Sequence, residues 1–291
     1  MVLDAHQHFW DFPEEYAWMT ERMAAIRRPF GPEDLAPRLA AAGVDRTVIV
    51  QTLNRAEESL RLLEIADARD AVAGVVGWVD LAAPDVDDLI AALRAAPGGA
   101  KLCGIRHLVH DEPDPAWLLR DDVQRGLAAV GRAGLVFDLL VRARELPAAL
   151  ETARRHELRF VVDHCAKPRI ADGRDDPVWA RALRPLAVLP HVSCKLSGLV
   201  TEADWEGWTP ADLQPYVERV LEWFGVDRIL FGSDWPVCLL AASYEQVFAA
   251  YAGAVEGLTA GERARVLGAN AVRVYELPKK SGLPMRASMR R

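Results

Sequence analysis

Short apolar runs alternate along the chain with longer amphipathic stretches. Eight of the runs are rich in β-branched residues and too apolar for strands with one solvated face, which is typical of parallel strands buried on both sides. They cover residues 2–9, 45–52, 72–81, 102–110, 135–141, 159–167, 192–199 and 228–235. A helical pattern follows each run, over residues 32–43, 56–70, 82–96, 117–134, 143–157, 177–190, 209–225 and 243–255. This rhythm predicts an α/β fold, a single-domain (β/α)8 barrel of the TIM type.

The C-terminal region adds a helix and a tail. Residues 259–277 carry a further helical pattern, which we expect to form an extra C-terminal helix packed on the outside of the barrel. The barrel domain therefore spans residues 1–277. Residues 278–291 contain five Lys or Arg and no acidic residue, together with Pro, Gly and Ser. We expect a flexible basic tail there.

The predicted loops are asymmetric. Joins from helix to strand are short, whereas several joins from strand to helix are long, at residues 10–32, 166–177 and 200–210. In a barrel of this type the long loops all lie at the C-terminal ends of the strands, which is where such barrels carry their active sites.

Composition and charge limit the classes of binding partner and the cellular compartment that we expect for this protein. The 291 residues include 35 Lys or Arg against 42 Asp or Glu, a net charge of −7, and the body without its tail is more acidic still. An acidic body is a poor binder of nucleic acid. No apolar run reaches about 18 residues, so no membrane-spanning helix is expected. The four cysteines form no CxxC pair and the N-terminus lacks the pattern of a signal peptide, which favours a reducing cytoplasm.

Ionisable residues occur at the ends of the first and last predicted strands. His6 and His8 alternate along the first strand and share one face, which in a barrel is the lumen. Asp234 ends the eighth strand, a position typical of a general base. Two hydrogen-bonded core histidines and an aspartate that caps a helix are the alternative interpretations.

Other strands bring further charges toward the same rim. Asp163 and His164 end strand six, Arg106 and His107 end strand four, and strands five and seven offer Asp138 and Lys195. Their convergence favours a site over isolated structural charges. A bulge would exchange the inward side chain of strand four, so the pattern leaves open whether Arg106 or His107 faces the lumen.

Aromatic residues in the loops are ambiguous, and several motifs are absent. Five tryptophans in the long loops are candidates to stack on a sugar-like ring or, alternatively, to pack the loops, namely Trp10, Trp18, Trp205, Trp208 and Trp235. The chain contains no GxGxxG or GxxxxGK[ST] loop for phosphates and no G-x-S-x-G elbow. Nucleotide chemistry and serine hydrolysis on the α/β-hydrolase scaffold are therefore not expected.

Four stretches together resemble one family. DAHQHFW (4–10), GIRH (104–107), KLSGLVTEADW (195–205) and GSDWPVCLL (232–240) are similar to the amidohydrolase superfamily, in particular its sugar-lactonase branch of L-fuconolactone hydrolases and 2-pyrone-4,6-dicarboxylate lactonases. The resemblance extends over residues 4–277. It implies a (β/α)8 barrel and a hydrolase that opens a small cyclic ester, an aldono-lactone such as L-fuconolactone.

The resemblance also implies roles for individual residues. Asp234 would activate the hydrolytic water, assisted by His6, His8, His164 and Arg106. We further expect the substrate to contact Trp10, His107, Lys195 and Trp235.

The expected metal content departs from the two-metal members of the superfamily. Strand four offers Arg106, and strand five carries Asp138 with no histidine, so a bridged two-metal site is not expected. We therefore expect either no metal requirement or one divalent ion, zinc before others, held by His6, His8 and Asp234.

Two other kinds of function remain as alternatives. The same barrel end would serve a lactone isomerase or a decarboxylase, and a non-catalytic protein that binds sugar acids would use the same aromatic and cationic residues. The expected partner is a small-molecule lactone, with no nucleic acid and no membrane. Self-association into a homo-oligomer is left open.

Overall fold

A computed structural model describes residues 1–173 and 175–278 of the chain. The basic tail expected at residues 278–291 therefore lies outside the described residues except for Pro278. Within the described residues, no helix has both the length and the apolar character needed to cross a membrane.

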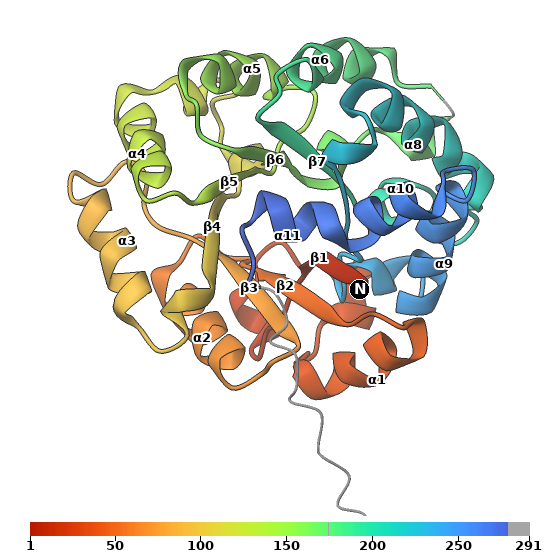
Figure 1. Ribbon diagram of the computed structural model, residues 1–291, viewed down its shortest axis with the longest axis horizontal. Coiled ribbons are helices and arrows are strands. Elements are labelled where there is room, and N and C mark those ends of the chain that lie inside the picture. Colours follow the sequence, from red (N-terminus) through yellow and green to blue (C-terminus); the bar gives the residue numbers. More distant parts are fainter. Residues whose placement is uncertain (174, 279–291) are drawn as a thin grey trace, which may run out of the picture.

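Eight parallel strands form the barrel expected from the sequence (Figure 1). The strands are β1 (Leu3–Gln7), β2 (Arg46–Val50), β3 (Val72–Gly77), β4 (Leu102–His107), β5 (Val136–Leu139), β6 (Phe160–Val162), β7 (Val192–Leu196) and β8 (Ile229–Phe231). Each strand pairs with the next in sequence order. The ring closes where the His8 N–H donates to the Trp235 carbonyl (2.7 Å) and the Asp234 N–H donates to the His6 carbonyl (2.8 Å).

The helices alternate with the strands and cover the outside of the barrel (Figure 1). They are α1 (Pro32–Ala42), α2 (Ala56–Asp67), α3 (Val86–Ala95), α4 (Asp121–Arg132), α5 (Leu146–Arg155), α6 (Pro177–Ala187), α8 (Pro210–Phe224) and α9 (Tyr244–Ala254). Local sequence sets several ends. Gly43 ends α1 in the left-handed conformation at φ 68°, and Ser243 with Gln246 forms a capping box at the start of α9.

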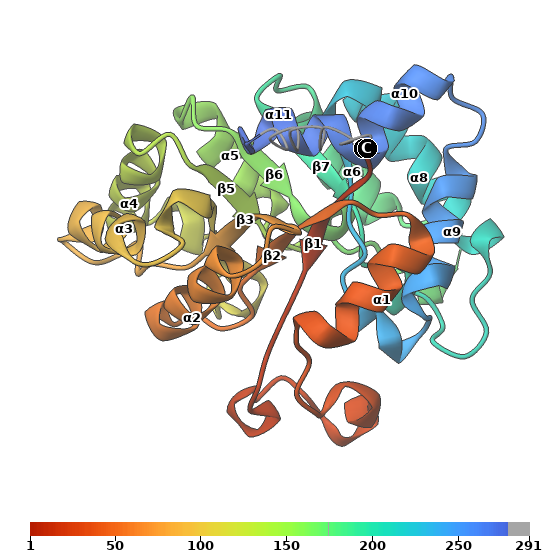
Figure 2. The same ribbon diagram turned by 60° about the horizontal axis from the view of Figure 1, so that its bottom comes forward.

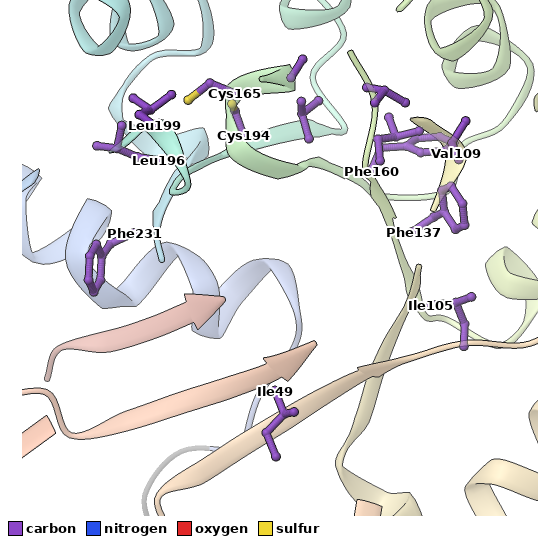
Figure 3. Packing of buried hydrophobic residues seen from close by; sticks show 14 of the residues in the cluster. Ile49, Ile105, Val109, Phe137, Phe160, Cys165, Cys194, Leu196, Leu199 and Phe231 are labelled. Carbon is purple, nitrogen blue, oxygen red and sulfur yellow. The ribbon is translucent and has the colours of Figure 1, made fainter. Parts of the chain in front are cut away.

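Two apolar layers hold strands and helices together. The larger lies between the outer faces of the strands and the helices, and Figure 3 shows part of it, with Ile49 on β2, Ile105 on β4 and Phe137 on β5. The smaller fills the lower lumen with small side chains such as Ala5, Val48 and Val136. Above this inner layer the lumen becomes polar, so the charged residues at the strand ends have an apolar base.

The C-terminal segment closes the lumen instead of packing outside the barrel. It forms α10 (Ala260–Ala264), a π-helical turn (Arg265–Ala269) and α11 (Asn270–Val274). Figure 1 looks onto this end, where α11 crosses the barrel. Ala271, Val274, Tyr275 and Leu277 pack against the inner layer of the strands. The expectation of an outside position was therefore wrong, because an open barrel end leaves inward-facing apolar side chains that another element must cover.

The long loops lie at the opposite end. The first loop, with short 3₁₀ turns at Pro13–Glu15 and Glu21–Ile26, extends away from the barrel on the side opposite α11 (Figure 2). The loop after β7 contains a short helix that the sequence did not predict, α7 (Leu199–Glu202). The C-terminal ends of the strands are thus surrounded by extended loops, as expected.

Asp4 fastens the seam between the first and last strands. Its Oδ1 accepts hydrogen bonds from the backbone N–H groups of His6 (3.0 Å) and Ser233 (2.9 Å), and its Oδ2 accepts one from the Tyr244 hydroxyl (3.1 Å). Asp4 is fully buried. Burial raises the pKa of Asp4 to about 6, although these hydrogen bonds oppose the shift.

We expect Asp4→Asn to gain stability relative to wild type as the pH rises from about 5 to about 7. The pKa of Asp4 lies near 6 in the fold and near 3.8 when unperturbed. The stability that the protonated carboxyl contributes is therefore present below pH 3.8 and lost as the pH rises through 6. Asparagine does not titrate and keeps the acceptor at Oδ1. Urea unfolding should show the difference in unfolding free energy growing by about 1 kcal/mol over this range.

Asp4→Ala is the matched control. It leaves the N–H groups of His6 and Ser233 without their acceptor and should lose about 1–3 kcal/mol for each buried group left unpaired. A difference between Asp4→Asn and wild type that stays constant with pH would contradict this description of Asp4.

Candidate active site

A cavity of about 380 Å³ opens at the C-terminal ends of the strands. Its size is within the range of small-molecule sites. His8, Arg106, His164 and Asp234 line its polar base, and Trp18, Met23, Leu108, Leu140, Val237 and Leu240 give it apolar walls. A larger hollow of about 660 Å³ on the outer surface between α8 and α9 contains no histidine. The chemistry therefore belongs to the cavity at the strand ends.

Three imidazoles surround one carboxylate oxygen at the base of this cavity. The Nε2 atoms of His8, His6 and His164 lie 3.2, 3.7 and 3.8 Å from Oδ1 of Asp234. The Nε2 atoms of His6, in β1, and His8, directly after it, are 3.2 Å apart, so the two rings meet on one side of the chain. All four side chains are buried.

Left-handed backbone presents two of these groups. Asp234 has φ 59°, and the four consecutive residues His164–Lys167 have φ between 52° and 59°. Non-glycine residues rarely adopt this conformation, and a run of four is more unusual still. Such strain persists only where the surrounding structure enforces it, and it concentrates at functional sites. The turn after β6 brings both His164 and Lys167 to the cavity.

Gly198 leaves the space that His164 occupies. It follows β7 with φ +65°, and a Cβ atom there would lie 2.5 Å from Nδ1 of His164. The His164 Nδ1 is also 2.9 Å from the hydroxyl oxygen of Ser197. The end of β7 therefore fixes the orientation of the His164 ring.

Arg106 faces the lumen and His107 faces away from it. Ile105 belongs to the outer apolar layer, so alternation along β4 turns Arg106 inward, which is the orientation that the sequence left open. Nη1 of Arg106 donates to Asp163 (3.0 Å). His107 contacts Glu112 (2.7 Å) and stacks on Trp117 with ring centroids 4.0 Å apart. His107 does not line the cavity, so its predicted contact with substrate is not supported by its position.

Lys195 lies beneath the cavity and not in its wall. Its Nζ donates to Oδ2 of Asp138 (2.6 Å) and lies 2.9 Å from Oδ1 of Asp163 and 3.1 Å from Nδ1 of His6. The side chain is fully buried. The position of Lys195 does not support its predicted contact with substrate. Its ammonium instead balances two buried carboxylates and contacts His6.

Trp10 and Trp235 are packing residues in this structure. Trp10 is fully buried, contacts Tyr16 and Phe30, and donates its indole N–H to the Arg28 carbonyl (2.8 Å). Trp235 packs edge-on against Phe30 with ring centroids 5.3 Å apart. Neither ring lines the cavity, so both correspond to the packing alternative. Trp18 and Trp205 are the tryptophans that do line it.

Buried partners set the charge of the site. Burial would raise the pKa of Asp234, but the neighbouring His164 and the hydrogen bond from His8 outweigh it, and the pKa is lowered from 3.8. Burial holds the pKa values of His6 and His164 well below 6.5. At neutral pH the base of the cavity therefore carries an ionised carboxylate beside two neutral imidazoles.

The two carboxylates beside Lys195 do not behave alike. Burial raises the pKa of both, yet Lys195, His6 and Arg106 bring that of Asp163 well below 3.8. The pKa of Asp138 rises to about 6, with burial as the main cause and Lys195 opposing it. One ammonium shared by two buried carboxylates explains the split.

The donor set fits one divalent cation. Among the described residues, one ligand atom each from His6, His164 and Asp234 lies within 4.8 Å of the others. His164 thus joins the predicted ligands. Nδ1 of His8 lies 2.7 Å from the Val50 carbonyl and must donate to it, because a carbonyl oxygen only accepts, and this contact fixes the ring with Nε2 3.2 Å from Oδ1 of Asp234. His8 therefore places a further ring nitrogen beside the donor set. The strand-five position holds Asp138, which is directed away to Lys195 and Tyr275.

Several cavity residues were not predicted from the sequence. Lys167 and Glu202 line the cavity and form an ion pair, and Arg142 lines it at the end of β5. Lys167 reaches the cavity only through the left-handed turn, and Glu202 only through the unforeseen helix α7. A basic residue directly after a predicted strand was the one available signal, and it applies to Arg142.

Comparisons with known proteins agree with this arrangement. A family model described as amidohydrolase matches residues 3–277. The L-fucono-1,5-lactonases of Burkholderia ambifaria and Burkholderia multivorans are 43% and 41% identical over 96% and 95% of this chain, and over 97% and 96% of their own length. A crystal structure of a Burkholderia multivorans amidohydrolase with bound zinc superposes with a TM-score of 0.90 at 40% identity, covering 96% of this chain and 100% of that one.

We expect Gly198→Ala to displace His164 from Asp234. The added methyl group would meet the His164 ring, and alanine is strained at φ +65°. A crystal structure of the variant should show the rotated imidazole, and turnover should fall by about 10²-fold because the reacting groups lose their alignment.

Gly43→Ala is its matched control. Gly43 has a similar φ of +68°, but a Cβ atom there meets nothing within 4 Å. Both variants should lose thermal stability, and only Gly198→Ala should lose turnover. An unmoved His164 in Gly198→Ala would refute the proposed role of this glycine.

Proposed function

This chain belongs to the amidohydrolase family, and we propose that it hydrolyses the cyclic ester of a small sugar-acid lactone, an aldono-lactone such as L-fuconolactone. The observation that carries the proposal is the ionised carboxylate of Asp234 among three imidazoles at the base of a cavity. A buried carboxylate kept ionised beside an open cavity is suited to taking a proton from water.

The cavity supports a substrate of this class. Its volume of about 380 Å³ suits a single sugar ring. Polar groups at the base face the reacting carbonyl, while Trp18 and Trp205 offer flat apolar surfaces for a ring. Curated relatives above 40% identity are L-fucono-1,5-lactonases. The same reaction on a related lactone is what this cavity supports best.

Asp234 acts first as a general base. Its carboxylate takes a proton from a water molecule, and the hydroxide oxygen forms a bond to the lactone carbonyl carbon. The carbonyl π electrons move onto oxygen and give a tetrahedral oxyanion. The lowered pKa of Asp234 keeps the base ionised at neutral pH. Its strained backbone and the hydrogen bond from its N–H to the His6 carbonyl fix its position.

Arg106 and the imidazoles stabilise the oxyanion. Arg106 lines the base of the cavity, and Asp163 together with the Gln51 carbonyl holds its guanidinium rigidly. A preorganised cation at this position stabilises negative charge that develops in the transition state. His8 and His164 line the same base and assist it.

The ring oxygen leaves in the second half of the reaction. The oxyanion collapses, the bond between the carbonyl carbon and the ring oxygen breaks, and the leaving oxygen takes the proton from Asp234. This step restores the carboxylate of Asp234 and yields a hydroxy acid. The acid then releases its own proton to solvent, so each turnover acidifies the medium.

We also propose that the site holds one zinc ion. His6, His164 and Asp234, with His8 beside them, would hold it, and a relative at 40% identity was crystallised with zinc. When bound there, zinc would supply Lewis-acid assistance to the reaction at the lactone carbonyl.

The cysteines described in the structure are free thiols, which supports our proposal of a reducing compartment such as the cytoplasm.

The alternative functions have less support. A lactone isomerase or decarboxylase would use the same barrel end, but the relatives that match most of this chain above 40% identity are lactone hydrolases. A protein that merely binds sugar acids has no need for a strained, buried carboxylate. Self-association remains a prediction.

We expect Asp234→Asn to lower lactone turnover by about 10²- to 10⁴-fold, the usual contribution of a general base. The amide keeps the shape of the side chain but cannot accept the proton of water. The measurement is acid release from a panel of aldono-lactones, followed with a pH indicator and corrected for spontaneous opening.

Asp80→Asn provides the control for this variant. Asp80 also follows a strand, but it is exposed and lies outside the cavity, so its variant should match wild type. Turnover by Asp234→Asn within about tenfold of wild type would rule out Asp234 as the base.

Wild-type enzyme should lose activity when a chelator removes its metal and regain activity with added zinc. Full activity after chelation would rule out the zinc requirement.

A further inference from the structure

A line of buried polar groups connects the active site with the opposite end of the barrel. The Tyr275 hydroxyl, directly after α11, donates to both oxygens of Asp138 (2.8 and 2.9 Å). Asp138 accepts from Lys195 (2.6 Å), and the same ammonium lies 2.9 Å from Asp163 and 3.1 Å from Nδ1 of His6. All of these side chains are buried. The helix that crosses the barrel in Figure 1 is therefore in contact with the site through side chains.

We propose that Tyr275 is a positioning residue for the reaction: it fixes Asp138, so that Asp138 and Asp163 together hold the Lys195 ammonium against His6. This proposal rests on the proposed function. Tyr275 lies beneath the site and takes no part in bond making. Its effect reaches the substrate only through the orientation of His6.

The geometry of Lys195 explains why Asp138 must be fixed. The lysine stem is flexible, and its ammonium donates to Asp138, forms an ion pair with Asp163 and contacts Nδ1 of His6. Asp163 is also held by Arg106 (3.0 Å). Among the described residues, Asp138 has Tyr275 as its second side-chain partner. Without the Tyr275 hydroxyl, Asp138 can rotate and Lys195 can follow it.

A shift of Lys195 changes what His6 presents to the cavity. Lys195 and Asp163 (3.3 Å) both lie at Nδ1 of His6, and the partner at this atom fixes the ring orientation and the tautomer. Nε2 of His6 then faces Asp234 at 3.7 Å. The C-terminal segment thus covers the inner apolar layer and also supplies the Tyr275 hydroxyl, the group of this series of contacts that lies farthest from the cavity.

The site of Tyr275 permits a clean substitution. Its ring packs in the inner layer with Val274, and the ring carbon Cε1 is within about 3.5 Å of where a Cβ on Gly104 would lie. Phenylalanine keeps this packing and removes the hydroxyl alone. We expect Tyr275→Phe to lower kcat by about five- to tenfold with KM unchanged, the lower end of what removing an outer partner of a site costs.

Two controls separate positioning from stability. Val274→Ala loosens the same apolar layer but keeps the hydroxyl of Tyr275. Tyr216→Phe removes a buried hydroxyl that donates to the Gly173 carbonyl (2.8 Å) away from the lumen. Both should retain kcat even where their thermal stability falls as much as that of Tyr275→Phe. Asp138→Asn should reproduce the kcat loss, and the double variant with Tyr275→Phe should lose no more than the larger single effect.

Imidazole NMR of ¹⁵N-histidine-labelled protein tests the proposal without any substrate. The His6 resonances, assigned by their absence in His6→Gln, should shift in Tyr275→Phe and stay in place in Tyr216→Phe. Unchanged His6 resonances together with unchanged kcat would overturn the proposal. Shifted resonances in a protein that opens no lactone would uphold the contact chain and reject the proposed function instead.

Discussion

The closure of the barrel between β8 and β1 is the constraint on which the site depends. The Asp234 N–H donates to the His6 carbonyl across this seam, and Asp4 ties both strands together from outside. At this seam Asp234 adopts a left-handed conformation, and its carboxylate lies 3.2 Å from His8 and 3.7 Å from His6. His6 and His8 therefore lie beside Asp234, although more than two hundred residues separate them in the sequence.

The interior of the barrel is arranged in layers that offset the free-energy cost of burying Asp234 among the histidines. Apolar side chains from the strands and α11 fill the base. Above them Lys195 and Arg106 balance Asp138 and Asp163, so that each of these four buried groups has a partner of opposite charge. An unpaired charge at this depth would be neutralised or would destabilise the fold. The balanced layer lies beneath Asp234, the carboxylate at the base of the cavity.

The sequence pattern predicted the strand order, the polar rim and the pairing of His6 with His8, because these follow from period and chain order alone. It did not predict which of Arg106 and His107 faces inward, since a bulge within the strand would have exchanged them. It placed the C-terminal helix outside the barrel. The helix instead covers the end of the lumen opposite the cavity, where inward-facing apolar side chains would otherwise be exposed. The positions of Trp10 and Lys195 do not support their predicted contacts with substrate. The residue type at a strand end does not show whether neighbouring groups already occupy its polar atoms.

The most direct test of the central claim follows the oxygen of water. In the proposed mechanism the water oxygen attacks the lactone carbonyl carbon. Hydrolysis in H₂¹⁸O therefore places the label in the carboxylate of the product and leaves the ring oxygen in the new hydroxyl. Mass spectrometry after enzyme-limited turnover should find one labelled carboxylate oxygen in each new product molecule. Label in the hydroxyl, or a product without label, would contradict the account and indicate a different bond cleavage or a reaction without hydrolysis.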